Sequence, residues 1–125
     1  MTEHRVLIIE DDASLSRALH RMLPLFDVTV CSTVDAARNV LLGERWDAVV
    51  SDIEIGDESG LDLFDEVVLR RPELTNRYLF VSGGVGKPDV RARLVRTGAP
   101  YLQKPFATDA FTEAVVLILV TVRAP

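Results

Sequence analysis

The chain has 125 residues, the usual size of one domain, and 48% of them are hydrophobic, which is enough to build a core. Its net charge of −5, with both signs interspersed and no basic run, argues against a nucleic-acid-binding face. Too few apolar residues follow the charged start for a signal peptide, and the apolar run Val115–Val122 is shorter than the roughly 20 residues that cross a membrane.

Strand-like and helix-like patterns alternate five times along the chain, without a low-complexity stretch or an obvious linker. In chain order, the expected elements are strand Arg5–Ile9, helix Ala13–Leu23, strand Asp27–Cys31, helix Val34–Leu42, strand Ala48–Ser51, helix Leu61–Arg70, strand Tyr78–Ser82, helix Asp89–Arg96, strand Pro100–Gln103 and a helix from Thr108 to about Val122. The first, third and fourth strands are near-continuous runs rich in Val, Ile and Leu, as expected of strands covered on both faces.

Residues that stop or cap helices support these boundaries. Proline ends the first helix at Pro24 and the third at Pro72. Caps are expected at Ser32, Gly43, Gly98 and Thr108. The arginine-rich helix Asp89–Arg96 has only a thin apolar side, which Ala92 and Val95 are expected to form.

Five βα units in series predict a parallel sheet, because each connection must be a right-handed helical crossover. The fold class is therefore α/β: a three-layer sandwich of a five-stranded parallel sheet and five helices. The pattern leaves the strand order open, but the flavodoxin-like order 2-1-3-4-5 is one of the common solutions. That order places the first strand beside the third and brings Glu10 and Asp11 next to Asp52.

Polar residues follow or close four of the strands. Glu10-Asp11-Asp12 follows the first strand, Asp52 the third and Lys104 the fifth, while Ser82 closes the fourth. Ligands of open α/β sheets bind outside the carboxyl ends of the strands. Acids, a hydroxyl and an ammonium at one edge suit a divalent cation and a phosphoryl group. Asp12 could equally cap the first helix, since acids favour helix N-termini.

These residues resemble the receiver domain of two-component response regulators. The matching motifs are Ile8-Ile9-Glu10-Asp11-Asp12, Asp47-Ala48-Val49-Val50-Ser51-Asp52, Ser59-Gly60-Leu61, Phe80-Val81-Ser82-Gly83 and Tyr101-Leu102-Gln103-Lys104-Pro105-Phe106. Their order and their positions at strand ends make the similarity strong, and it extends from Val6 to about Val122. The resemblance implies one receiver domain over residues 1–125, a signalling switch that catalyses only its own phosphorylation and dephosphorylation.

By this resemblance, Asp52 is the phosphoacceptor, and a histidine kinase or a histidine phosphotransfer protein is the donor. Glu10 and Asp11 are similar to the acidic pair that holds Mg²⁺, with Asp11 a direct ligand and Glu10 acting through water. The backbone carbonyl of Glu54 would be a further ligand. Lys104 resembles the lysine that contacts the phosphoryl group, and the peptide bond after it would be cis.

Ser82 is similar to the switch hydroxyl of this family, and Tyr101 to the aromatic residue whose rotation reports activation. Phosphorylation is expected to draw Ser82 toward the phosphoryl oxygens and to let Tyr101 swing inward, a shift between two packings. The surface formed by helix Asp89–Arg96, the last strand and the last helix would then change, and it is expected to take a downstream protein or a second copy of the chain. Gly56 stands where the family often has proline, which predicts a looser loop after Asp52.

Two other functions stay open on the sequence alone. A small aspartyl-phosphate phosphohydrolase would use Asp52 as its nucleophile, although such enzymes usually have a second aspartate where this chain has Glu54. A pseudo-receiver would dock partners without phosphorylation, but it would have lost an acidic residue or the lysine, and none is lost here.

The composition also predicts the kinds of partner and the location of the protein. No nucleic-acid or membrane partner is expected, and the single cysteine, Cys31, excludes an internal disulfide and predicts a buried, reduced thiol in a cytoplasmic protein. No output domain is expected within these 125 residues. A single-domain regulator and a receiver cut from a larger chain both fit the sequence.

Overall fold

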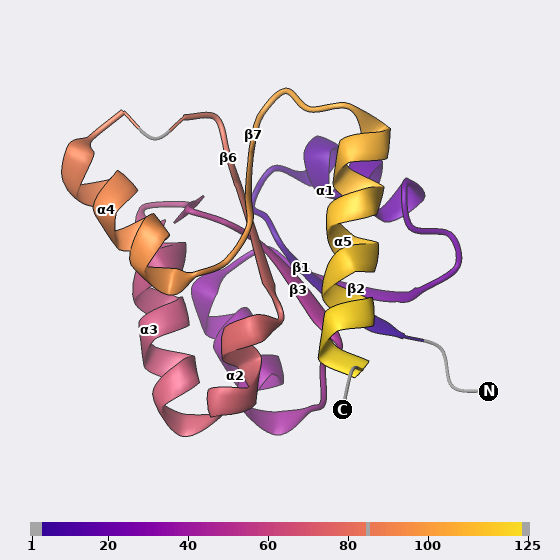
Figure 1. Cartoon of the computed structure of the whole chain (residues 1–125), viewed down its shortest axis with the longest axis horizontal. Coiled ribbons are helices and arrows are strands. Elements are labelled where there is room, and N and C mark those ends of the chain that lie inside the picture. Colours follow the sequence, from indigo (N-terminus) through magenta and orange to yellow (C-terminus); the bar gives the residue numbers. More distant parts are fainter. Residues whose placement is uncertain (1–3, 85, 124–125) are drawn as a thin grey trace.

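One parallel sheet forms the middle layer of the molecule (Figure 1). The computed structural model describes residues 4–84 and 86–123, so the charged start at Thr2–Glu3 and the end at Pro125 lie outside the described residues. The sheet consists of β1 (Arg5–Ile9), β2 (Asp27–Cys31), β3 (Ala48–Asp52), β6 (Tyr78–Ser82) and β7 (Tyr101–Gln103). Its order is β2-β1-β3-β6-β7 with every pair parallel, which confirms the predicted order 2-1-3-4-5.

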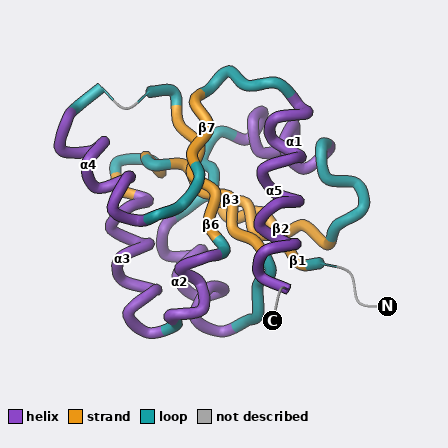
Figure 2. The backbone as a smooth tube through the Cα atoms, in the orientation of Figure 1, coloured by secondary structure: helices purple, strands orange, loops and turns teal. Residues whose placement is uncertain are grey.

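Helices cover both faces of the sheet and form the outer layers of a three-layer sandwich (Figures 1 and 2). One face carries α1 (Ala13–Arg21) and α5 (Thr108–Arg123). The other face carries α2 (Val34–Gly43), α3 (Gly60–Arg70) and α4 (Pro88–Thr97). Within the described part of the chain, no helix is long and apolar enough to cross a membrane.

Alternate strand residues supply the two halves of the core. Leu7 and Ile9 of β1 pack in the cluster with α2, α3 and α4, whereas Val6 and Ile8 pack in the cluster with α1 and α5. Burial on both sides explains why the central strands are apolar at consecutive positions. Cys31 is buried on the α2 side, which confirms the expected buried thiol, and burial raises its pKa.

Arginine side chains close the edge at which the strands begin, which we call the amino edge. Trp46 is fully buried there, its indole N–H donates to a carbonyl oxygen of α2 at 2.8 Å, and the Arg5 guanidinium carbon lies 4.4 Å from its ring centroid. Arg77 donates to the Trp46 carbonyl oxygen at 2.8 Å, and Arg71 donates to that of Leu41 at 2.7 Å. Backbone carbonyl groups at this edge and at the end of α2, which have no partner within a strand or helix, thus accept hydrogen bonds from arginine side chains.

The predicted ends of the first two helices are partly wrong. Thr33 rather than Ser32 caps α2, because its extended backbone lets its Oγ1 accept the Ala36 N–H at 3.1 Å. Gly43 is the last residue of α2 and not its cap. The first helix was expected to reach Leu23, but α1 ends at Arg21 and the chain then turns so that Leu23 enters the core.

The thin apolar side predicted for α4 lies on the surface of the molecule. Ala92 and Val95 are exposed, Val95 to 73%, and Leu94 is the buried residue of this helix. Arg93 orients α4, because its guanidinium pairs with Asp62 at 2.8 Å and with Asp65 at 2.9 Å on α3. The helix does end at a left-handed glycine, since Gly98 has φ +72°.

Two short elements were not predicted. A hairpin of β4 (Glu54–Ile55) and β5 (Glu58–Ser59) lies between β3 and α3, and a 3-10 helix, η1 (Pro72–Asn76), follows α3. Ser59 then caps α3, because its hydroxyl accepts the N–H groups of the helix's second and third residues. The hairpin matters most here, because it follows Asp52 directly.

Candidate functional site

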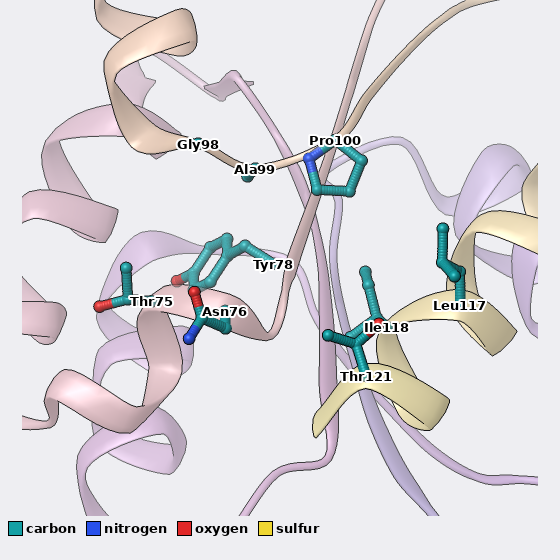
Figure 3. A pocket seen from close by; sticks show the side chains of 9 residues that line it. All are labelled: Thr75, Asn76, Tyr78, Gly98, Ala99, Pro100, Leu117, Ile118 and Thr121. Atoms are coloured by element: carbon teal, nitrogen blue, oxygen red, sulfur yellow. The ribbon is translucent and has the colours of Figure 1, made fainter. Parts of the chain in front are cut away.

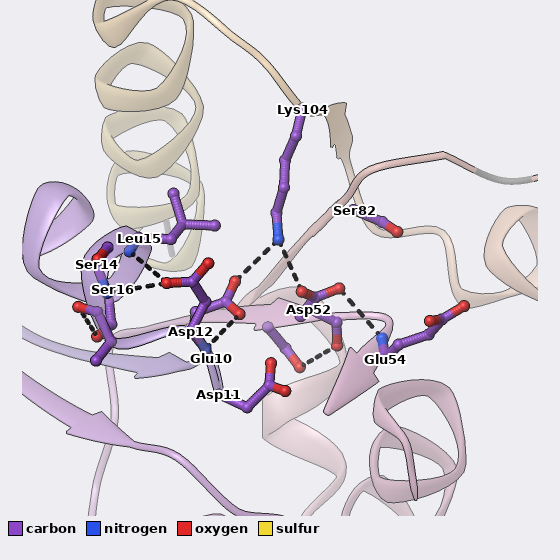
Figure 4. Close-up of polar contacts among 12 residues, drawn as sticks. Glu10, Asp11, Asp12, Ser14, Leu15, Ser16, Asp52, Glu54, Ser82 and Lys104 are labelled. Atoms are coloured by element: carbon purple, nitrogen blue, oxygen red, sulfur yellow. Dashed lines mark hydrogen bonds and ion pairs between the residues drawn. The ribbon is translucent and has the colours of Figure 1, made fainter. Parts of the chain in front are cut away.

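Four strands end at one edge of the sheet, the carboxyl edge, and carry the predicted polar residues there (Figure 4). Asp52 is the last residue of β3, Ser82 is the last residue of β6, and Glu10 and Asp11 follow β1 directly. Because β1 pairs with β3 and β3 with β6, these side chains come from neighbouring strands. Lys104 follows β7, and its backbone N–H donates to the Ser82 carbonyl oxygen at 2.7 Å.

Lys104 bridges two of the acids. Its Nζ lies 2.7 Å from Asp52 Oδ2 and 2.9 Å from Glu10 Oε1. Burial opposes the charge on the Lys104 ammonium, but the hydrogen bonds to Asp52 and Glu10 outweigh it and raise its pKa. Lys104 is therefore charged and lies between the two carboxylates. The peptide bond between Lys104 and Pro105 is cis, as expected.

Glu10 is the most deeply buried acid at this edge, with 2% of its surface exposed. Burial raises its pKa to about 6, and the charge of Asp52 adds to this, while hydrogen bonds from Lys104 and from the Asp12 N–H oppose it. An acid with a raised pKa beside other acids is typical of a site that is neutralised by a cation.

Glu10, Asp11 and Asp52 form an acidic cluster. Each offers one carboxylate oxygen, and these oxygens all lie within 4.8 Å of one another. Oxygen donors at this spacing fit a hard divalent cation such as Mg²⁺, which takes carboxylates and retains several waters. The N–H of Glu54 donates to Asp52 Oδ1 at 3.1 Å, whereas the expected role of the Glu54 carbonyl as a metal ligand stays a prediction.

Asp12 is turned away from this cluster and caps α1. Its Oδ1 accepts the N–H groups of Ser14 and Leu15 at 2.9 and 3.1 Å. Of the two interpretations of Asp12, the capping role is the one that fits these contacts.

The hairpin after β3 provides a backbone donor to each of two carboxylates. The Glu54 N–H bonds to Asp52, and the Gly56 N–H donates to Asp11 Oδ2 at 3.1 Å. In the structure a two-stranded ladder forms around Gly56, and the looser loop expected from this glycine stays a prediction.

The return of the hairpin passes very close to Asp52. A Cβ added to Gly60 would lie 2.0 Å from the Asp52 carbonyl oxygen, so only glycine fits at the first position of α3. The Gly60 N–H donates to the Ile53 carbonyl oxygen at 2.6 Å, and the Ser51 hydroxyl donates to the Asp52 carbonyl oxygen at 2.9 Å. These contacts hold the backbone of Asp52 from two sides.

Ser82 closes β6, the strand next to β3, and Tyr101 begins β7, the edge strand that pairs with β6. The Ser82 hydroxyl has only long contacts to the backbone of Gly84, at 3.4 and 3.5 Å, among the described residues. The Tyr101 hydroxyl is buried and has no hydrogen-bond partner in the described part of the chain. Burial, followed by the charge of Asp52, raises the pKa of Tyr101. Their roles as a switch stay a prediction.

Two depressions on the surface differ in chemistry. One of about 510 Å³ opens onto the acidic cluster and is lined by Glu10, Asp11, Asp12, Asp52, Glu54, Gly56, Ser82, Gly83, Gly84 and Lys104. The other, of about 390 Å³, lies at the amino edge between η1, the end of α4 and α5 (Figure 3). Its lining residues are mostly apolar or uncharged, and in Figure 3 the Tyr78 hydroxyl points away from its middle. Only the first depression has the charges that phosphoryl chemistry requires.

The sequence located the acids and the lysine but missed the backbone that holds them. The hairpin and the hydroxyl of Ser51 have no role in the expectations above. A signal for the hairpin is present, because Gly56-Asp57 is a glycine-first pair suited to a two-residue turn.

Comparisons with known proteins agree with the fold and show the family of the chain. A family model for the response regulator receiver domain matches residues 6–116. The chain is similar to the two-component response regulator ARR2 of Arabidopsis thaliana, with 30% identity over 85% of this chain and 16% of that protein. It is also similar to the response regulator protein FleR of Pseudomonas aeruginosa, with 32% identity over 89% of this chain and 24% of that protein. The chain thus spans less than a third of either relative.

A solved structure shares the fold over nearly the whole chain. It is a CheY-like response regulator receiver domain protein from Methanospirillum hungatei, with a TM-score of 0.88 at 20% identity, covering 97% of each chain. At this identity the likeness concerns the fold alone. It agrees with the strand order and the two helical layers described above.

Proposed function

This chain belongs to the response regulator receiver domain family, and on that premise we propose that Asp52 is its phosphoacceptor. The position of the Asp52 carboxylate carries this proposal. It lies 2.7 Å from Lys104 Nζ, in a cluster whose three acids each have an oxygen within 4.8 Å of the others. The cluster opens onto a depression that a phosphoryl donor can reach. As a receiver domain, the chain is a signalling domain, and the phosphoryl step is the only chemistry we propose for it.

The proposed step is a displacement at phosphorus. An oxygen of the Asp52 carboxylate attacks a phosphohistidine of a histidine kinase or of a histidine phosphotransfer protein. The new P–O bond forms as the P–N bond breaks, and the leaving imidazole retains the bond pair and takes a proton from water. Lys104 offers positive charge to the transferred group, which is most of what this chemistry asks of a protein.

The proposed ligands for Mg²⁺ are Asp11, Asp52 and the carbonyl of Glu54 directly, with Glu10 acting through water. Both oxygens of Glu10 already have donors, since Oε1 bonds to Lys104 and Oε2 to the Asp12 N–H, which supports its indirect role. When bound, the cation supplies positive charge that offsets the acids and the oxygens of the phosphoryl group.

Ser82 and Tyr101 are proposed to carry the signal away from Asp52. Because the Ser82 hydroxyl has only long contacts in the described residues, it can turn toward a phosphoryl oxygen at little cost. That turn would change how Tyr101 packs beside α4, and a gap of a few kcal/mol between two packings is enough for such a switch. The buried Tyr101 hydroxyl without a partner supports a residue that changes its contacts.

The output face is proposed to be α4, β7 and α5. Exposed apolar side chains on the two helices support a contact surface there, since Val95 is 73%, Leu117 65% and Val120 62% exposed. A downstream protein or a second copy of the chain is the proposed partner, with neither nucleic acid nor membrane. We further propose that residues 1–125 form one receiver domain. We also propose that it is located in the cytoplasm, where a cysteine such as Cys31 stays reduced.

Phosphorylation by acetyl phosphate, followed by intact-mass measurement, tests this function. Wild-type protein is expected to gain one phosphoryl group in the presence of Mg²⁺ and none after chelation. Asp52→Asn should gain none, because the nucleophile is lost, whereas Asp57→Asn in the same hairpin should react like wild type.

An unchanged mass of the wild-type protein would contradict the proposal and favour a docking module that works without phosphorylation. Sustained hydrolysis of a general phosphate monoester would contradict it in another way and favour a phosphohydrolase. If the Asp52→Asn variant gains a phosphoryl group as the Asp57→Asn variant does, Asp52 is not the acceptor.

A further inference from the structure

Asp11 differs from the other two acids of the cluster in its hydrogen-bond donor. Lys104 bonds to both Glu10 and Asp52, but among the described residues the donor recorded for the Asp11 carboxylate is the backbone N–H of Gly56, at 3.1 Å from Oδ2. The two residues are 45 positions apart in the chain. A backbone donor on a distant hairpin therefore holds a side chain that no lysine reaches.

The hairpin can provide this donor only if residue 56 adopts a positive φ and has a backbone N–H. Glu54 pairs with Ser59 and Ile55 with Glu58, which leaves Gly56-Asp57 as a two-residue turn. Gly56 has φ +64° and Asp57 has no positive φ, the combination expected of a type II′ turn. Proline, which often stands here in the family, has a fixed negative φ and no N–H, so it could neither take this conformation nor donate.

The contact leaves Asp11 able to bind a cation. A carboxylate has two oxygens and about four acceptor positions, of which the Gly56 N–H uses one. A hydrogen bond to an ionised carboxylate is stronger than one between neutral groups, and it orients the carboxylate. The same hairpin also donates to Asp52 through the Glu54 N–H, so one hairpin contacts an acid that follows β1 and an acid that ends β3.

We propose that Gly56 is a positioning residue for the acidic cluster, and that its N–H holds the Asp11 carboxylate in the orientation used to bind a divalent cation. This rests on the proposed function for the identity of the cation, but the hydrogen bond itself does not depend on it. Groups that orient metal ligands in this way typically contribute about 10-fold to 100-fold to metal affinity.

Amide hydrogen exchange in metal-free protein tests the hydrogen bond directly. Replacing the acceptor in Asp11→Ala should speed exchange of the Gly56 amide by at least about 10-fold, the factor expected for one bond to a charged group. The Gly98 amide donates to the Val95 carbonyl oxygen, far from the cluster, and should exchange at an unchanged rate. An unchanged rate at Gly56 would overturn the proposal.

Mg²⁺ binding, followed by calorimetry with the metal alone, tests the consequence. Gly56→Pro should weaken binding by about 10-fold or more. Gly56→Asn keeps the N–H and tolerates positive φ, so it should bind within about threefold of wild type. Gly98→Ala introduces the strain of a positive φ at another open position, φ +72°, and should bind like wild type.

The outcomes separate this inference from the proposed function. Wild-type protein that binds no Mg²⁺ and gains no phosphoryl group would contradict the function, while the exchange rate of Gly56 would still decide the hydrogen bond. Equal Mg²⁺ affinity in wild type, Gly56→Asn and Gly56→Pro would overturn the inference and leave the function intact. If Gly56→Pro does not fold, the exchange experiment on Asp11→Ala remains decisive.

Discussion

The two edges of the sheet differ in how completely their charged side chains are paired. At the amino edge, the guanidinium groups of Arg71 and Arg77 bond to backbone carbonyls and that of Arg5 lies over Trp46, so each positive charge has a fixed partner. At the carboxyl edge, Lys104 pairs with two of the three carboxylates of the acidic cluster, Glu10 and Asp52, whereas Asp11 accepts a backbone N–H. The amino edge is built for stability, whereas the carboxyl edge retains an excess of negative charge that a cation and a phosphoryl group can use.

Adding one methyl group at each edge should give the largest difference in the free energy of unfolding between the two edges. Gly60→Ala places a Cβ 2.0 Å from the Asp52 carbonyl oxygen, and we expect it to lower the free energy of unfolding by about 3 kcal/mol. Gly43→Ala, in the last turn of α2, meets no atom within 4 Å and should raise the free energy of unfolding by about 0.5 kcal/mol. Urea denaturation measures both. Similar values for the two variants would show that Gly60 is not constrained by Asp52.

Removing one positive charge at each edge should also have unequal effects. Lys104→Met leaves the buried charges of Glu10 and Asp52 without their partner, and it should cost about 3 kcal/mol in metal-free protein. Arg71→Met loses its bond to the Leu41 carbonyl and should cost about 1 kcal/mol. Mg²⁺ should stabilise Lys104→Met more than it stabilises Arg71→Met, because the metal also replaces the lost positive charge, and thermal unfolding with and without the metal measures both. Equal rescue of both variants would contradict a charge imbalance confined to the carboxyl edge.

Neutralising one aspartate at each edge should give changes of opposite sign. Asp11→Asn relieves repulsion within the acidic cluster and should raise the free energy of unfolding of metal-free protein by about 1 kcal/mol. Asp47 accepts the Arg5 N–H at 2.8 Å, so Asp47→Asn should lower it by about 1 kcal/mol. Chemical denaturation without metal checks both signs, and a loss of stability in Asp11→Asn would contradict the charge repulsion expected within the acidic cluster.

The smallest expected effect is a difference in pH dependence. Burial raises the pKa of Glu10 from its ordinary 4.5 to about 6, so its stabilising contribution is full below pH 4.5 and is lost as the pH rises through 6. At the amino edge, hydrogen bonds from its own N–H and then from Arg71 lower the pKa of Glu73, so its contribution is present above pH 4.5 and is lost as the pH falls. Glu10→Gln should remove the first dependence and Glu73→Gln the second, as unfolding at several pH values would show.

Most of the fold was predictable from the sequence because its signals are local. The apolar runs of β1, β3 and β6 and the helices between strands leave few topologies other than a parallel sheet. The errors occurred where neighbouring residues compete for one role. Ser32 and Thr33 are both good N-caps, and only the extended backbone of Thr33, which follows from the path of the chain, decides between them.

The acids and the lysine of the site were predictable because strand order brings the ends of neighbouring strands together. Their backbone support was not, since strands of two residues, such as β4 and β5, are too short to show a periodic pattern. The close approach of Gly60 to Asp52 depends on how the hairpin returns, which no local pattern reports. Sequence thus identifies which groups meet, while the geometry that orients them comes from contacts between distant segments.

Trp46 is an internal fluorescence probe that responds only to changes close to its own indole ring. It is the single tryptophan of the chain, it is fully buried, and it lies at the opposite end of β3 from Asp52. Its fluorescence emission should shift to longer wavelength when the chain unfolds and the indole enters water. Mg²⁺ or a phosphoryl group at the far end of the strand should leave the emission spectrum nearly constant, so folding and ligation can be followed as separate signals in one sample.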